Sequence, residues 1–254
     1  MSTSMRIVDH KEMDLSAALV VVGFPGLGLV GSIASNFLVS TLNLEKIASI
    51  LSRDFPPMAV LRDGRVASPV RIHAAPMVCG LDGKCNQLAV VLSEVTPKAE
   101  VLYDLCEALL SWGLEKKVLE MVVLEGFSRP AGASDTLVYG AANSKESLER
   151  LKQLNVKPMG EGIISGLSGV LSYLGEARGL NVTCLLAETT KEYPDAKSAA
   201  KLLEVLDPLV PQIRIDPKPL YQQAELIESH LKSTLKKHGE DMADIAERSR
   251  IMFG

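Results

Sequence analysis

Residues 19–31 read Leu-Val-Val-Val-Gly-Phe-Pro-Gly-Leu-Gly-Leu-Val-Gly, and this stretch decides the fold class. Its first four residues form a continuous apolar run closed by glycine, which is typical of a central β-strand covered on both faces. The glycines that follow indicate a tight turn, and we expect a helix from Gly28 to Leu42. A buried strand that leads through a turn into a buried helix is the repeating unit of an α/β fold.

The same alternation of strand and helix resumes further along the chain. We expect strands at residues 46–51, 88–92, 117–124 and 182–187, and helices at residues 97–112, 144–154, 163–175 and 196–206. Thr96 and Ser144 are the expected N-caps of two of these helices. The Asp63-Gly64 and Asp82-Gly83 pairs indicate hairpins. The pattern predicts a largely parallel sheet with helices on both faces and added antiparallel hairpin strands.

The composition fits one large domain with a C-terminal extension. Of the 254 residues, 47% are hydrophobic and 23% are charged, which is enough to form one sizeable core. Prolines cluster before Leu220, and from there to Lys237 the apolar residues recur at helical spacing. We expect a folded α/β/α domain over residues 1–216 and a C-terminal helix and tail over residues 217–254.

Charge, hydropathy and cysteine usage exclude several classes of function. The net charge is -4 and no run of Lys or Arg is long enough to neutralise a row of phosphates, so we expect no nucleic-acid partner. Residues 15–44 carry no charge, but glycines and a proline interrupt them, so we expect no membrane association and no signal peptide. The four scattered cysteines suit a reducing cytoplasm, and we expect no metal and no cofactor.

Residues 26–31 spell G-x-G-x-x-G, the fingerprint of dinucleotide-binding folds. A pyrophosphate at the helix N-terminus needs free backbone amides, and Pro25 removes one of them. Asp54 lies where a ribose-binding acid is expected, but in a turn-like context. We therefore favour close packing of the helix on the sheet as the reason for these glycines, with a small anion site as the alternative.

A second glycine-rich stretch runs from Gly160 to Leu171. Each interior glycine costs a helix about 1 kcal/mol, so close contact with the sheet or with a partner subunit is again the interpretation we favour. The alternative is a small anion or ligand pocket built from backbone amides and serine hydroxyls. Its candidate residues, taken from both stretches, are Gly26, Gly28, Gly31, Ser165 and Ser168.

Several glutamates lie at or just after predicted strand ends, where α/β enzymes place catalytic groups. Solubility alone also places carboxylates there, and no serine lies in a G-x-S-x-G motif. The sequence therefore assigns no catalytic role to the four glutamates at these positions, Glu94, Glu125, Glu161 and Glu188.

The chain ends in Ile251-Met252-Phe253-Gly254, which places two large apolar side chains on a terminus that is normally polar. These side chains either pack on the protein's own surface or dock into a partner.

Three segments, taken in chain order, resemble the proteasome assembly chaperone family. Residues 23–34 resemble the opening strand, turn and helix of its archaeal members, residues 162–171 its glycine-rich segment, and residues 187–203 its strand, Pro-Asp turn and Leu-rich helix. The resemblance implies an α/β/α sandwich related in shape to nucleoside phosphorylases. It also implies homo-oligomers without demonstrated catalysis.

Family members that bind the proteasome core particle end in a hydrophobic residue, a tyrosine and any final residue, which enter pockets between subunits of the α-ring. The matching positions are Met252, Phe253 and Gly254. Phe253 departs from the pattern, because it keeps the aromatic ring but lacks the phenolic hydroxyl. The resemblance thus implies a cytoplasmic chaperone or adaptor with the α-ring and itself as partners. The alternatives are a small-molecule enzyme of nucleoside phosphorylase or hydrolase type, and a self-assembling paralogue with another partner.

Overall fold

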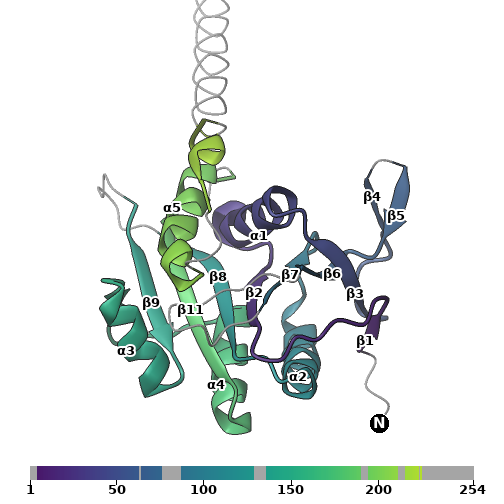
Figure 1. Ribbon diagram of the computed structural model, residues 1–254, viewed down its shortest axis with the longest axis horizontal. Helices are drawn as coiled ribbons and strands as arrows, with labels where there is room; N and C mark the ends of the chain where they lie inside the picture. Colours follow the sequence, from purple (N-terminus) through teal and green to yellow (C-terminus); the bar gives the residue numbers. More distant parts are fainter. Residues whose placement is uncertain are drawn as a thin grey trace, which may run out of the picture.

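The computed structural model describes residues 5–62, 64–75, 87–128, 136–189, 194–210, 215–222 and 224. Within these ranges a nine-stranded sheet forms the centre of the molecule, and helices cover both of its faces (Figure 1). The Asp82-Gly83 pair, most of the helix expected from Leu220 to Lys237, and the tail residues Met252, Phe253 and Gly254 lie outside the described residues.

The strands of the large sheet are β1 (Arg6–Asp9), β2 (Leu19–Gly23), β3 (Glu45–Leu51), β6 (Val70–Ala75), β7 (Leu88–Ser93), β8 (Glu120–Ser128), β9 (Val138–Ala142), β10 (Lys157–Pro158) and β11 (Asn181–Thr189). A small separate sheet pairs β4 (Val60–Arg62) with β5 (Arg65–Ala67). The helices are α1 (Val30–Thr41), α2 (Ala99–Glu115), α3 (Lys145–Gln153), α4 (Gly166–Arg178) and α5 (Ala196–Leu206), with short 3-10 turns η1 (Leu27–Leu29) and η2 (Asp207–Leu209).

The middle of the large sheet is parallel. Strands lie in the order β1-β3-β6-β7-β2-β8-β11-β9-β10, and β7, β2, β8 and β11 all run in the same direction. Antiparallel pairing extends this centre on both sides: β6 pairs with β7 and β3 with β6 on one side, and β9 pairs with β11 on the other. The β4-β5 hairpin projects from the body (Figure 1) and includes Gly64, with a φ of +73°, whereas Asp63 of the predicted Asp63-Gly64 turn lies outside the described residues. The predicted sheet with its added hairpin strands is therefore confirmed.

Each face of the sheet has its own hydrophobic core. Along β2 the residues alternate, so that Val20 and Val22 belong to the core under α2 and α4. Leu19 and Val21 belong to the core under α1 and α5. The continuous Val-rich run is thus explained by burial on both faces, and the molecule has three layers (Figure 1). No helix in the described part of the chain is long and apolar enough to cross a membrane.

The starts of α1, α2 and α4 differ from the predictions, and α1 begins at Val30 rather than Gly28, because Gly28 and Leu29 have positive φ angles. Thr96 is not an N-cap, because α2 begins at Ala99 after Lys98, which makes no side-chain capping bond. The Thr96 hydroxyl instead lies 3.5 Å from the carbonyl oxygen of Pro25. Helix α4 begins at Gly166 rather than Ile163, since Gly166 has a φ of +70° that ends the preceding extended segment. The Ser144 cap of α3 is confirmed, and its hydroxyl accepts from the Ser147 amide.

Helix α1 packs so closely on β8 that no side chain fits between them at Gly31. A Cβ atom on Gly31 of α1 would lie 2.1 Å from the carbonyl oxygen of Leu124. A Cβ atom on Gly23 would lie 2.3 Å from the carbonyl oxygen of Gly31. The Ser35 hydroxyl donates to the Gly31 carbonyl at 2.9 Å, which fixes the same turn of the helix. These contacts support close packing as the reason for Gly23 and Gly31.

We predict that Gly31→Ala lowers the free energy of unfolding by about 3 kcal/mol or more, because the new methyl group overlaps a backbone carbonyl that has no room to move. The matched control is Gly162→Ala, since a Cβ atom there meets nothing within 4 Å. Urea unfolding of the two variants measures the difference. Equal stabilities of both variants would show that α1 does not depend on this close approach.

Candidate functional site

The segments that carry the sequence resemblance converge where the parallel strands end. Strand β2 leads into η1 and α1, β8 ends beside them, and β11 leads towards α5. Gly126 of β8 marks the meeting point, since a Cβ atom there would lie 2.4 Å from the Leu27 carbonyl oxygen and 2.8 Å from Thr189. The carboxyl ends of parallel strands are the usual position of ligand sites in open α/β sheets.

Asp195 connects the first and third of these segments. Its backbone amide donates to the carbonyl oxygen of Gly28 at 2.8 Å. Its carboxylate accepts from the Thr189 hydroxyl at 2.8 Å and from the Ser198 amide at 2.9 Å, so that it caps α5 and holds the end of β11 together. Gly28 has a φ of +62°, and a Cβ atom on it would lie 2.3 Å from the Thr189 hydroxyl oxygen. The Pro-Asp turn and the first glycine turn are therefore one unit.

Glu125 connects the first and second segments. Its Oε2 accepts a hydrogen bond from the Ser168 hydroxyl in the first turn of α4. Its Oε1 faces two glycines, since a Cβ atom on Gly26 would lie 3.7 Å from it and one on Gly166 would lie 3.8 Å from it. Both glycine-rich stretches thus flank a single carboxyl group on β8.

A small cavity opens at this carboxyl group and encloses about 200 Å³. Its walls are mainly apolar, and the lining residues are Phe24, Pro25, Gly26, Thr96, Pro97, Leu102, Val123, Leu124, Glu125, Gly166 and Leu167. Pockets for drug-sized ligands and cofactors enclose roughly 300–1,000 Å³. The cavity therefore suits a molecule or side chain smaller than a nucleoside.

The electrostatics of the cavity do not suit an anion. Burial raises the pKa of the Glu125 carboxyl above its ordinary value of 4.5, and the hydrogen bond from Ser168 offsets part of that rise. No Lys, Arg or His is among the described residues that line the cavity. An ionised Glu125 repels a phosphate, so the candidate anion pocket lacks the charge that it needs.

The structure separates the predicted pocket residues into two groups. Gly26 lines the cavity and Ser168 binds Glu125 beside it. Gly28 and Gly31 instead lie against Thr189 and Leu124, away from the cavity. Ser165 is an exposed residue before α4, and its side chain makes no capping bond. The central residue of the site, Glu125, was considered only as one of several strand-end carboxylates.

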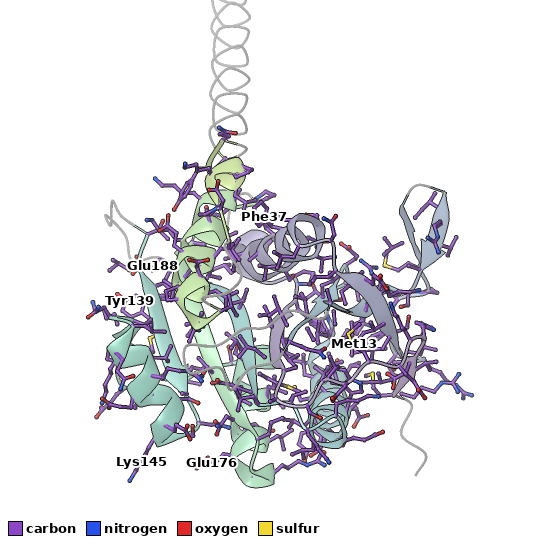
Figure 2. The ribbon with its side chains drawn as sticks, viewed as in Figure 1. Met13, Phe37, Tyr139, Lys145, Glu176 and Glu188 are labelled. Atoms are coloured by element: carbon purple, nitrogen blue, oxygen red, sulfur yellow. The ribbon has the colours of Figure 1, made fainter. Side chains whose placement is uncertain are left out.

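Two of the three other strand-end glutamates have structural partners. Glu94 accepts from the nearly buried Arg71 guanidinium at 2.8 Å. Glu188 is buried and accepts from the Tyr139 hydroxyl at 3.4 Å, and both residues are labelled in Figure 2. Glu161 lies exposed in the loop before α4. These contacts give Glu94 and Glu188 structural roles, and no contact is described for the exposed Glu161.

The two cysteines in the described part of the chain, Cys106 and Cys184, are free and buried. Burial raises the pKa of Cys106 to about 12 and that of Cys184 to about 11, so both thiols are protonated near neutral pH and are poor nucleophiles. Among the described residues no group of three or more His, Cys, Asp or Glu side chains is placed to hold a metal ion.

Comparison with known proteins relates most of the chain to one family. The profile of the PAC2 family matches residues 20–235. Two uncharacterised proteins of Methanocaldococcus jannaschii are similar along nearly their whole length. One is 29% identical over 238 residues, which cover 94% of each protein. The other is 28% identical over 249 residues, which cover 96% of this chain and 93% of the relative.

Solved structures share the fold. Pyrococcus furiosus PbaA, described as an archaeal homolog of proteasome-assembly chaperone, is 25% identical with a TM-score of 0.85, covering 99% of this chain and 100% of PbaA. Pyrococcus furiosus PbaB, described as an archaeal proteasome activator, is 22% identical with a TM-score of 0.78, covering 91% of this chain and 99% of PbaB. The likeness to PbaB shows the fold alone.

We predict that Glu125→Gln makes the protein more stable than the wild type at about pH 8 and equally stable at about pH 4. Burial raises the pKa of Glu125 in the folded state, so the folded protein keeps this proton to higher pH than the unfolded chain. The resulting stabilisation is complete below pH 4.5, the ordinary pKa of the group, and is lost as the pH rises through the raised pKa.

Urea unfolding at the two pH values measures this difference. Glu176→Gln on the exposed side of α4 (Figure 2) removes a carboxylate elsewhere and serves as the control. A pH-independent difference between Glu125→Gln and the wild type would contradict the prediction.

We predict that Asp195→Ala lowers the free energy of unfolding by about 2 kcal/mol or more, because the Thr189 hydroxyl and the α5 amides lose their acceptor together. Ser144→Ala removes a cap that serves α3 alone and should cost about 1 kcal/mol. Thermal unfolding ranks the two variants. An equal loss in both would mean that Asp195 acts only as a local cap.

Proposed function

The chain belongs to the PAC2 family, and we propose that it is a proteasome assembly chaperone or adaptor that docks its C-terminal tail into α-ring pockets of the core particle. In this proposal the protein acts in the cytoplasm as a homo-oligomer and catalyses no reaction. Residues 1–216 form the folded platform, and residues 217–254 carry the tail.

The observation that carries the proposal is the likeness to PbaA. It extends over 99% of this chain and 100% of PbaA with a TM-score of 0.85, at 25% sequence identity. Fold alone does not establish function, because one fold serves many activities. Here the likeness is joined by the family match over residues 20–235 and by a chain end of the type that core-particle binders carry.

The proposed docking has a direct physical basis in the tail. Met252 and Phe253 bury apolar surface in a pocket, and the terminal carboxylate of Gly254 pairs with a pocket lysine in a charge-assisted contact. One short tail must order flexible residues and so binds weakly. A homo-oligomer that presents several tails to a ring of equivalent pockets gains affinity through effective concentration.

The geometry at the carboxyl ends of the strands supports a binding protein over a nucleoside-processing enzyme. The cavity there encloses about 200 Å³ and has a carboxyl group on its wall. A nucleoside needs more room, and a phosphate needs cations that the described lining residues do not provide. The chemistry of this cavity therefore favours the first of the competing functions.

We predict that the intact chain co-sediments with an archaeal proteasome core particle and that a chain ending at Ile251 does not. The truncation removes the docking residues, whereas the folded domain lies far earlier in the sequence and keeps its stability. Circular dichroism of both proteins is the control for folding. Equal co-sedimentation of both chains would contradict tail docking.

Substitutions at Phe253, where the sequence departs from the family pattern, test whether the ring enters a pocket. Phe253→Tyr restores the phenolic hydroxyl and should strengthen each contact by about 1 kcal/mol, the usual net value of one hydrogen bond. Phe253→Ala removes the ring and should abolish binding. If neither variant differs from the wild type, the ring does not enter a pocket.

If no form of the protein binds the core particle and a nucleoside or phosphate raises the melting temperature, the enzyme alternative replaces the proposal.

A further inference from the structure

Glu125 is an ionisable residue whose burial costs free energy. It follows four buried apolar residues of the central strand β8 and lies between the sheet and α4. A carboxylate that loses water costs free energy unless partners replace the lost hydrogen bonds. The Ser168 hydroxyl donates to Oε2 and the Ser168 backbone also interacts with the carboxylate, but no Lys, Arg or His is among the described residues that line the cavity.

Two other carboxylates at the sheet, those of Glu120 and Glu94, each have an arginine partner. Glu120, at the opposite end of the same strand, is buried and forms an ion pair with Arg150. Glu94 pairs with Arg71. No positively charged side chain contributes to the pKa of Glu125, which burial raises. An ionised Glu125 is therefore neutralised either by a proton or by a cation from outside the described residues.

The space beside Oε1 is open and apolar. Gly26 and Gly166 have no side chains, so nothing in either residue covers the oxygen. Phe24, Leu102 and Leu167 form apolar walls around it. The cavity of about 200 Å³ thus has mainly apolar walls with the Glu125 carboxyl group among its lining residues.

Few chemical groups satisfy both features of the cavity. A phosphate or carboxylate is repelled by the ionised Glu125, and a hydrocarbon brings no positive charge to it. A nucleoside exceeds the volume. We infer that the cavity binds a primary alkylammonium group, with the ammonium on Oε1 of Glu125 and the alkyl chain against Phe24, Leu102 and Leu167.

Binding of the ammonium group offsets the free-energy cost of burying the ionised carboxylate. An opposite charge within hydrogen-bond distance favours the ionised form and offsets the effect of burial on the Glu125 pKa. The apolar chain adds a favourable term from the surface that it removes from water. A free aliphatic amine and the lysine side chain of a protein present this same chemistry, and they differ in whether a peptide backbone must fit at the mouth of the cavity.

The test uses the full-length protein and n-butylammonium chloride as the probe, with saturation-transfer NMR over a series of pH values from about 6 to 9, because burial raises the pKa of Glu125 and binding should increase as the carboxyl ionises. Glu125→Gln keeps the shape and should weaken binding by about tenfold, because a charge-assisted hydrogen bond becomes a neutral one. Gly26→Val keeps the charge and should also weaken binding, because its methyl groups fill the space beside Oε1. Glu176→Gln is the matched control and should bind as the wild type does.

Two further probes sharpen the result. Butan-1-ol has the same chain without the charge and should bind more weakly than n-butylammonium. Nα-acetyl-lysine methylamide carries the same ammonium on a peptide, so binding of this probe indicates a lysine side chain as the occupant, whereas binding of n-butylammonium alone indicates a free amine. Absence of n-butylammonium binding, or equal binding to wild type and Glu125→Gln, would overturn the inference. Neither outcome depends on the C-terminal tail or on the core particle.

Discussion

The contact between the backbone of α1 and the carbonyl oxygen of Leu124 on β8 is the constraint on which the rest of the structure depends. Only glycine fits at position 31, because a Cβ atom there would overlap that oxygen at 2.1 Å. The close approach places the turn before α1 directly over the ends of β8 and β11. Gly28 then meets Thr189, and Gly26 meets Glu125. One steric requirement thus assembles the segments that the sequence spreads over some 180 residues.

The parts of the fold that sequence predicts are those with a strong local signal. Strands β2, β7, β8 and β11 each contain an uninterrupted apolar stretch because both faces of the sheet are covered, and all of them were predicted. Strands β1, β9 and β10 were not, since they are short and partly exposed, and β10 has two residues. Their pairing depends on the neighbouring strand more than on their own composition.

The candidate site was predicted only in part. Gly26 and Ser168 were recognised, but the pairing of Ser168 with Glu125 joins residues 43 positions apart and follows from the packing of α4 on β8. One local signal was available. Glu125 interrupts an apolar central strand, and an ionisable residue in such a position often marks a functional site. The glycines did not identify the site, because Gly28 and Gly31 serve packing.

In the proposed function a folded platform, which contains the Glu125 cavity, carries a C-terminal tail that recognises the core particle. An electron cryomicroscopy structure of the protein bound to an archaeal core particle would show whether the tail makes the contact. The account predicts that the Phe253 ring and the Gly254 carboxylate occupy a pocket between two α-subunits. Contacts made by the folded domain alone, for example by the β4-β5 hairpin, with the tail outside every pocket, would contradict it.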